Sequence, residues 1–182
     1  TAEGALSQIS SSVQRIREIA VQSSNATLED RTGLQKEVDQ LTQEISRIVQ
    51  TTTFNGTSLF DVSGTSSLTF QVGQDGNANN QVSLTLSGMT GGLISAYASS
   101  LTATGTVNVS SAATASAALS TLETDIDDIS KQRATFGAVQ NRFESVISNL
   151  SNYSENLTSS RSRILDTDFA SETANLTKAQ IL

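Results

Sequence analysis

The sequence predicts a mainly α-helical protein with a small β part: an elongated antiparallel bundle of two amino-terminal helices and one long carboxy-terminal helix, with a β-hairpin region. Three observations predict this fold. Apolar residues recur at spacings of three and four near the amino terminus and at every seventh position in the last third of the chain. A short central stretch instead alternates apolar and polar residues, which is typical of half-buried strands.

Two apolar stripes indicate the two amino-terminal helices. The first stripe is narrow and consists of Leu6, Ile9, Val13, Ile16 and Ala20. The second repeats the spacing at Leu34, Val38, Leu41, Ile45 and Ile48. The polar residues 23–32 between them predict a connection, with the second helix starting near Thr27 and Asp30 in its first turn. A short connection favours antiparallel neighbours.

The centre of the chain changes to a period of two. Apolar residues alternate with polar ones over 68–72 and again over 82–86, and the turn-rich residues 73–80 separate the two runs. This pattern predicts a β-hairpin. Residues 87–116 are mostly Gly, Ser, Thr and Ala, so we expect an exposed, variable insertion there.

A much longer helix is predicted after the insertion. Every seventh residue from 122 to 164 is apolar, namely Leu122, Ile129, Phe136, Phe143, Leu150, Leu157 and Ile164. This length is typical of coiled coils rather than of globular helices. From Phe136 onward, Val139, Val146 and Tyr153 broaden the seam, so that it could accept both amino-terminal helices. We therefore expect Phe136, Phe143 and Leu150 to pack in the core.

These elements divide the chain into four parts. Residues 1–86 would form the amino-terminal part of a helical core with the hairpin, and 87–116 a reduced outer domain. Residues 117–165 would form the long core helix, and 166–182 the start of a terminal segment. Because Thr1 lies within the stripe pattern and the chain ends on an apolar stretch, both ends look cut from a longer protein.

Composition argues against several classes of function. The chain has no His and no Cys, so the commonest general base, the thiolate nucleophile and the usual zinc ligands are missing. Its net charge of −7 argues against nucleic acid and anionic membranes as partners. No run is apolar enough to span a bilayer, and residues 1–10 lack the basic and then apolar pattern of a signal peptide. We expect no catalytic residue, cofactor or metal.

The hairpin turn contains a weak calcium-loop pattern. Asp75, Asn77 and Asn79 place oxygen ligands at alternating positions. The sixth position of such a loop is Asn80 instead of Gly, however, and the twelfth is Leu86 instead of Glu. A plain hairpin turn is favoured.

The densest acidic cluster lies on the predicted long helix. Asp125, Asp127 and Asp128 could in principle act as paired carboxylates in acid and base chemistry. Because they flank Ile126 and Ile129, we expect them to point into solvent instead.

Several segments together resemble bacterial flagellin, the subunit of the flagellar filament. They are TAEGAL at 1–6, QRIREIAVQS at 14–23, TFNG at 53–56, GAVQNRFESVISNL at 137–150 and the tail at 160–182. The resemblance implies a structural, non-enzymatic protein that is exported through the flagellar secretion apparatus and self-assembles outside the cell for motility. It also implies that this chain is a core lacking most of both terminal segments.

The resemblance further implies recognition by Toll-like receptor 5. The positions carried over from the family are Arg15 and Ile19 on the first helix, Glu37 on the second and Arg142 on the long helix. In this sequence Arg15, Ile19 and Gln22 share one face away from the main stripe, which suggests an exposed apolar side chain among polar ones. Lateral packing between filament subunits is the alternative use of this face.

Two further functions remain open at this point. A hook–filament junction protein would share the terminal architecture, although the QNRF and QRIREIAVQ segments favour flagellin. A cell-surface adhesin or polysaccharide-binding homologue is the other. The chain offers sugars few aromatic platforms, with two Tyr and no Trp.

Overall fold

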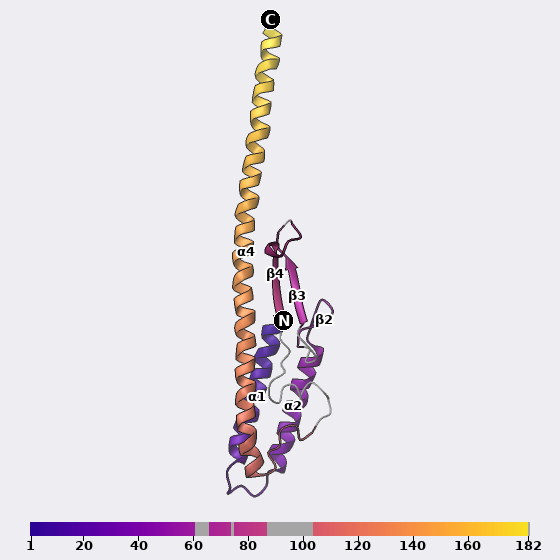
Figure 1. Cartoon of the computed structure of the whole chain (residues 1–182), viewed down its shortest axis with the longest axis vertical. Coiled ribbons are helices and arrows are strands. Elements are labelled where there is room, and N and C mark those ends of the chain that lie inside the picture. The colour runs from indigo at the N-terminus through magenta and orange to yellow at the C-terminus, as the bar shows by residue number, and fades with distance from the viewer. Residues whose placement is uncertain (61–65, 74, 87–103, 182) are drawn as a thin grey trace. The chain divides into compact units, whose positions relative to one another are not determined.

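The computed structural model describes residues 1–60, 66–73, 75–86 and 104–181 (Figure 1). It divides into two compact units, Thr1–Val139 and Gln140–Leu182. The elements in chain order are α1 (Ala2–Ser23), α2 (Thr32–Thr51), β1 (Thr53–Phe54), β2 (Thr57–Ser58), β3 (Ser66–Gln71), η1 (Ala78–Asn80), β4 (Gln81–Leu86) and α4 (Ala112–Ile181). The fold is mainly α with small antiparallel β parts, as the sequence predicts.

The core of unit 1 joins α1, α2 and the first part of α4. Both predicted stripes face this core. On α1 the buried face is broader than predicted, because Ser12, Ile19 and Ser23 are buried beside the stripe. A helix that contacts two neighbours needs such a wide face, and α1 lies against both α2 and α4 in this core.

Polar contacts show that α1 and α4 run in opposite directions. Near the start of α1, the Glu3 carboxylate pairs with the Arg133 guanidinium at 2.6 Å. At the end of α1, the Ser23 hydroxyl donates to the Val109 carbonyl, close to the start of α4. The predicted antiparallel arrangement therefore holds within unit 1.

The connection between α1 and α2 is held by Arg31. Its guanidinium donates to the backbone carbonyls of Ser23 at 3.0 Å and Asn25 at 2.9 Å, which are acceptors at and just after the end of α1. The Asp30 carboxylate accepts from the Thr32 amide at 2.8 Å. The second helix begins at Thr32 and not near Thr27, so Asp30 lies before its first turn and not within it.

The predicted central hairpin is formed by β3 and β4. The strands pair antiparallel with Leu68 opposite Leu84 and Phe70 opposite Val82. These four apolar side chains are buried or half-buried, whereas the polar side chains of Ser67, Thr69, Ser83 and Thr85 are exposed. The alternation in the sequence therefore identified both the strands and their buried face.

A second, smaller hairpin was not predicted. β1 and β2 pair antiparallel around Asn55 and Gly56, whose φ angles are +50° and +78°. Two successive positive φ angles are the requirement of a type I′ turn, and Asn-Gly is the sequence that favours it. The TFNG segment therefore builds a tight turn directly after α2.

The insertion predicted at 87–116 is not wholly exposed. Residues 87–103 lie outside the described residues, but Val107 and Val109 are buried in the helical core. The Gln35 side chain donates to the Val107 carbonyl and accepts from the Val109 amide, at 2.9 and 2.8 Å. Because side chains of α2 satisfy its backbone, this extended segment can be buried without a sheet, which a Gly/Ser/Thr-rich composition does not reveal.

The prediction that all three aspartates of the acidic cluster face solvent is wrong for Asp125, which is fully buried. Asp127 is exposed, and Asp128 pairs with Lys131 at 3.1 Å. Ala118 and Gln132, one heptad before and after Asp125, are also buried. The buried face of α4 is therefore wide in this region, because a second heptad column beside the main one also faces the core.

Unit 2 consists of the last part of α4, a single helix. The prediction that Leu150 packs in the core is wrong, because 43% of this side chain is exposed. Phe143 is half-buried, whereas Phe136, in unit 1, packs against the core cluster. A single helix cannot bury its own apolar stripe, so the column that is covered in unit 1 is open in unit 2.

Candidate interaction surfaces

Arg15 links α1 to α2 through an ion pair on the surface of unit 1. Its guanidinium lies 2.8 Å from the Glu37 carboxylate and 3.1 Å from that of Glu18. The hydrogen bond to Glu37, followed by the one to Glu18, raises the pKa of Arg15 above its ordinary value. Both partners of the helix-bridging pair remain largely exposed, so Arg15 and Glu37 present one charged patch spanning two helices.

The exposed apolar residue near the end of α1 is Val21 and not Ile19. Ile19 is only 1% exposed and belongs to the core of unit 1, so the predicted exposed Ile19 is wrong. The broad buried face of α1 includes this position. Val21, in contrast, is 54% exposed, and Gln22 is exposed beside it.

Val21 lies in a shallow groove on α1. The groove is lined by Gln14, Arg17, Glu18 and Val21. Arg17 and Glu18 each lie three or four positions from both Gln14 and Val21, so the four residues share one helix face. Within the described part of the chain, Arg17 makes no ion pair, whereas Glu18 is engaged by Arg15. The groove thus combines an exposed apolar side chain with an unpaired cation.

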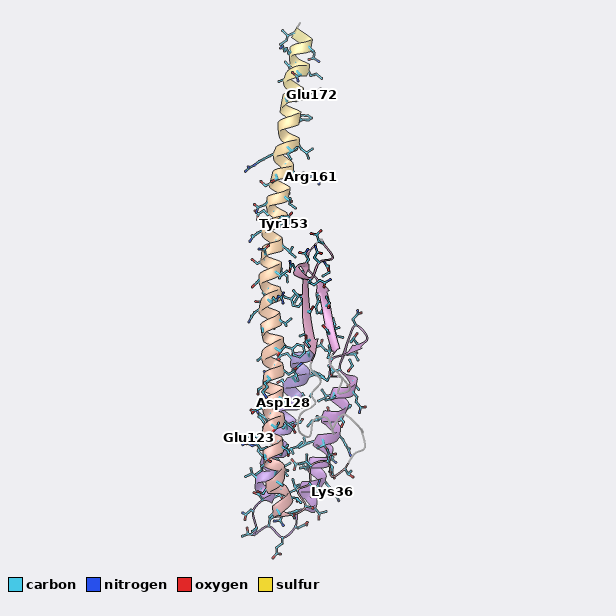
Figure 2. The ribbon with its side chains drawn as sticks, viewed as in Figure 1. Lys36, Glu123, Asp128, Tyr153, Arg161 and Glu172 are labelled. Atoms are coloured by element: carbon cyan, nitrogen blue, oxygen red, sulfur yellow. The ribbon has the colours of Figure 1, made fainter. Side chains whose placement is uncertain are left out.

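Unit 2 presents an apolar surface along its single helix. Large apolar side chains are exposed there over its whole length, namely Ile147, Leu150, Tyr153, Leu157, Ile164, Leu165, Phe169, Leu176 and Ile181. Arg142, the fourth position expected to contact a receptor, is also exposed on this helix. Figure 2 shows that the side chains of Tyr153, Arg161 and Glu172 project from the helix.

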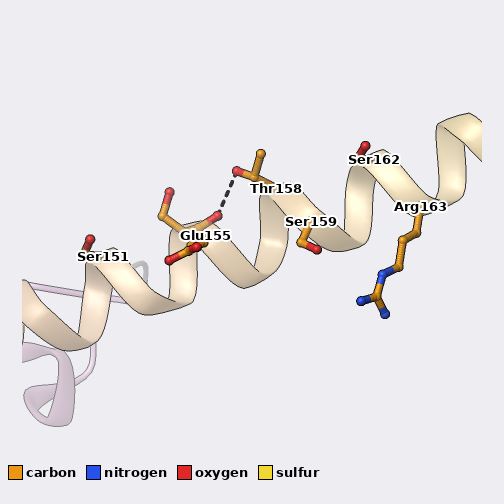
Figure 3. A pocket seen from close by; sticks show the side chains of 7 residues that line it. Ser151, Glu155, Thr158, Ser159, Ser162 and Arg163 are labelled. Carbon is orange, nitrogen blue, oxygen red and sulfur yellow. Dashed lines mark hydrogen bonds between the residues drawn. The ribbon is translucent and has the colours of Figure 1, made fainter.

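A polar groove follows another side of the same helix (Figure 3). It is lined by Ser151, Ser154, Glu155, Thr158, Ser159, Ser162 and Arg163. The Thr158 hydroxyl donates to the Ser154 carbonyl at 2.8 Å, within the helix itself. The groove therefore offers small polar side chains, some of which are already engaged with their own backbone.

In the hairpin turn with the calcium-like pattern, backbone carbonyls accept hydrogen bonds from a side chain of β3. The Gln71 side chain donates to the carbonyls of Gly73 and Asp75, at 2.7 and 2.6 Å. The Asp75, Asn77 and Asn79 side chains are exposed. Among the described residues no cluster of three or more His, Cys, Asp or Glu could hold a metal ion. No described helix is long and apolar enough to cross a membrane.

Comparison with known proteins gives the family. The bacterial flagellin N-terminal helical region matches residues 1–65, and the bacterial flagellin C-terminal helical region matches residues 119–182. A flagellin of Bacillus subtilis is 36% identical over all of this chain, which covers 68% of that protein. This chain belongs to the bacterial flagellin family.

Further relatives agree with that assignment. A flagellin of Halalkalibacterium halodurans is 39% identical over the whole chain, which spans 64% of the length of that relative. The crystal structure of Bacillus cereus flagellin is similar with a TM-score of 0.63 at 30% identity, covering 81% of this chain and 80% of that one. Flagellins are structural proteins, and this fold is similar to that of a solved member.

Two surface features of this flagellin were missed by reasoning from the sequence. Val21 lies seven residues after Gln14 and four after Arg17, and helical spacing alone could have placed the three on one face. Phe54, 48% exposed on β1, could have been found from the Asn-Gly turn that follows it. Neither residue belongs to the apolar stripes or to the alternating runs from which the fold was predicted.

Proposed function

We propose that this chain is the structural subunit of a bacterial flagellar filament and assembles with copies of itself through the apolar surface of unit 2. The observation that supports this most is the continued heptad column. Leu150, Leu157 and Ile164 keep the spacing that buries Leu122 and Ile129 in unit 1, but they are 43 to 71% exposed. An apolar column that no described element covers is well suited to bind another molecule.

The energetic argument favours coverage of this surface. Burying one large aliphatic side chain stabilises an association by roughly 1.5–3 kcal/mol. Soluble monomers rarely expose long contiguous apolar patches, and those that do use them for association. A helix with a sustained seven-residue repeat buries its stripe best against other helices, because side chains of both interdigitate along the whole length.

Polar substitutions in the column test the proposal. We expect the double variant Leu157→Ser, Ile164→Ser to lose the ability to form sedimenting filaments, as seen by ultracentrifugation and electron microscopy. Asn156→Ser, on the same helix outside the column, is the matched control and should assemble like the wild type. Normal filaments from the double variant, or none from the wild type, would reject this assembly surface.

We propose that the assembled protein lies outside the cell, on the bacterial flagellum, after export through the flagellar secretion apparatus. Membership of the flagellin family supports this location. Antibody labelling of intact, unpermeabilised cells should decorate filaments. Labelling only after permeabilisation would contradict an extracellular location.

We also propose that the α1–α2 surface is recognised by Toll-like receptor 5. The exposed Arg15–Glu37 pair, with Gln22 on the same side of α1, supports a polar contact there, with Arg142 as a further expected contact. Because Ile19 is buried, its contribution would be to hold α1 in place and not to touch the receptor.

Titration of the receptor ectodomain distinguishes these roles. We expect Arg15→Ala to weaken binding by roughly tenfold to a hundredfold, which is the range for an interfacial arginine anchor, without lowering the melting temperature. Ile19→Ala should lower the melting temperature first. Arg47→Ala, which removes a similarly exposed ion pair on α2, is the control. Equal affinities for wild type and Arg15→Ala would remove the assignment.

A further inference from the structure

The turn between β1 and β2 contains a chemically labile pair of residues. Asn55 is followed by Gly56, and no other asparagine in the chain precedes a glycine. In such a pair the backbone nitrogen of the glycine can attack the side-chain carboxamide of the asparagine, because a residue without Cβ leaves that approach unhindered. Both residues are exposed, so water and hydroxide reach the reacting atoms directly.

The reaction open to this pair is deamidation through a cyclic imide. The deprotonated Gly56 nitrogen forms a bond to Asn55 Cγ, the Cγ–Nδ2 bond breaks, and the amide group takes up a proton and leaves as ammonia. Water then opens the ring. Opening at the Cγ–N bond gives an aspartate on an unchanged backbone, whereas opening at the bond to the main-chain carbonyl carbon gives an isoaspartate, whose backbone runs through Cβ and Cγ. Water enters and ammonia leaves, so the step needs no oxidant or reductant.

The folded turn holds Asn55 in a conformation that does not allow this ring to close. Its φ of +50°, followed by +78° at Gly56, belongs to a type I′ turn, in which ψ of the first central residue is roughly +30°. At this ψ an L residue places its Cβ nearly opposite the following nitrogen about the Cα–C bond. The imide ring contains that bond and needs Cβ and the nitrogen on the same side, so the backbone has to rotate before reaction.

Contacts on both sides of the turn oppose this rotation. Before the turn, the Thr52 amide donates to the Ile48 carbonyl of α2 at 3.0 Å, and after it the Leu59 amide donates to the Thr52 carbonyl at 3.1 Å. Leu59 and Phe60 are buried in the core cluster of unit 1. Rotation at Asn55 therefore has to break the β1–β2 pairing while the core holds both flanks in place.

We propose that Asn55 is the principal deamidation site of this chain and that the β1–β2 turn protects it while the hairpin is closed. An aspartate product can re-form the turn, because Asp-Gly also favours type I′. An isoaspartate product cannot, because it adds a backbone atom to a two-residue loop. Deamidation thus converts a transient opening of the hairpin into permanent damage. This inference is independent of the proposed filament function.

Mass spectrometry of the chain incubated in mildly alkaline buffer tests the site and its protection. In guanidinium chloride, peptide mapping should find deamidation first at Asn55, with Asn25, which precedes Ala26, as the internal reference. In the folded chain the rate at Asn55 should be lower by roughly tenfold or more, because only the opened fraction reacts. Equal rates in the folded and unfolded chains would overturn the protection. Faster deamidation of another asparagine in the unfolded chain would overturn the site.

Matched variants assign the rates to the glycine and to the core contacts. Gly56→Ala, measured in denaturant so that strain at its positive φ plays no part, should slow deamidation of Asn55 by roughly tenfold, because the added Cβ hinders the attack. Leu59→Ala, measured in the folded chain, should raise the rate severalfold by weakening a buried flank of the hairpin. Val21→Ala, at an exposed position on α1, is the control and should leave the rate unchanged. A folded Leu59→Ala chain that reacts no faster than the wild type would overturn the role of the core contacts.

Discussion

The two units of this flagellin carry the same seven-residue apolar repeat in opposite environments. Leu122 and Ile129 in unit 1 are almost fully buried, at 0 and 1% exposure, because α1 and α2 join α4 in the core. Leu157 and Ile164 in unit 2 are 52 and 71% exposed. The repeat thus determines which face of α4 is apolar, whereas neighbouring elements determine whether that face is covered. One helix serves as an internal core element and as a surface available for assembly.

The largest expected difference between the units is in how much stability is lost when a leucine of the repeat is replaced by alanine. Leu122→Ala should lower the free energy of unfolding by about 2–5 kcal/mol, because it leaves a cavity in a closed core. Leu157→Ala should change the unassembled chain by less than about 0.5 kcal/mol, since the side chain is half exposed and Ala favours helix. Denaturant unfolding followed by circular dichroism measures both. Equal losses would mean that unit 2 is covered in the monomer.

The two phenylalanines on either side of the boundary sharpen the comparison. Phe136 packs against the core cluster while half-buried, so Phe136→Ala should cost about 2–3 kcal/mol, below the range for a fully buried ring. Phe143→Ala, in unit 2, should lower the free energy of unfolding by less than about 1 kcal/mol. Thermal melts of both variants provide the check. A larger destabilisation at Phe143 than at Phe136 would place the boundary in the wrong part of α4.

Periodicity predicted the elements of the fold well, because local pattern determines them. The sequence pattern predicted the stripes of α1 and α2, the β3–β4 alternation and the long helix. It did not predict which parts of these apolar faces other elements bury. Leu150 belongs to the same heptad column as the buried Leu122, yet its side chain is 43% exposed. Asp125 is a charged residue expected in solvent, yet it is 0% exposed. These outcomes depend on which other segments pack nearby, and no local pattern contains that information.

The buried segment before α4 should depend on a single amide side chain. Gln35→Ala removes hydrogen bonds to both Val107 and Val109 and leaves backbone groups of a buried segment unsatisfied. We expect a loss of about 1–3 kcal/mol in unfolding free energy. Gln40→Ala, at an exposed position on the same helix, is the control and should be neutral. A neutral Gln35→Ala would show that burial of the valines alone holds this segment.

The smallest expected effect is electrostatic and lies at the start of α2. Hydrogen bonds from the Thr32 amide, and then from its hydroxyl, lower the pKa of Asp30. A lowered pKa in the folded state adds stability above the ordinary aspartate pKa of about 3.9, and this stability is lost as the pH falls through the folded value. The melting temperatures of wild type and Asp30→Asn should therefore converge in acid. A difference that grows below about pH 4 would contradict a stabilising role of these hydrogen bonds.

The surface of unit 1 was partly predictable. Arg15 and Glu37 form the expected exposed patch, and their sequence positions sufficed because both are long charged side chains that solvate readily. Ile19, expected on the surface, is buried, since a helix with two neighbours buries a wider face than one stripe predicts, and Val21 is the exposed apolar residue instead. Ile19 in the core and Val21 on the surface are only two positions apart on α1.

Hydrogen–deuterium exchange, measured on the unassembled chain and on filaments, tests the contrast between the units most directly. Amides of residues 122–129 should be protected in both states, because the core of unit 1 closes within the chain. Amides of residues 150–164 should exchange quickly in the unassembled chain and become protected only in filaments. Equal protection of residues 150–164 in both states would contradict the claim that another copy covers the apolar surface of unit 2.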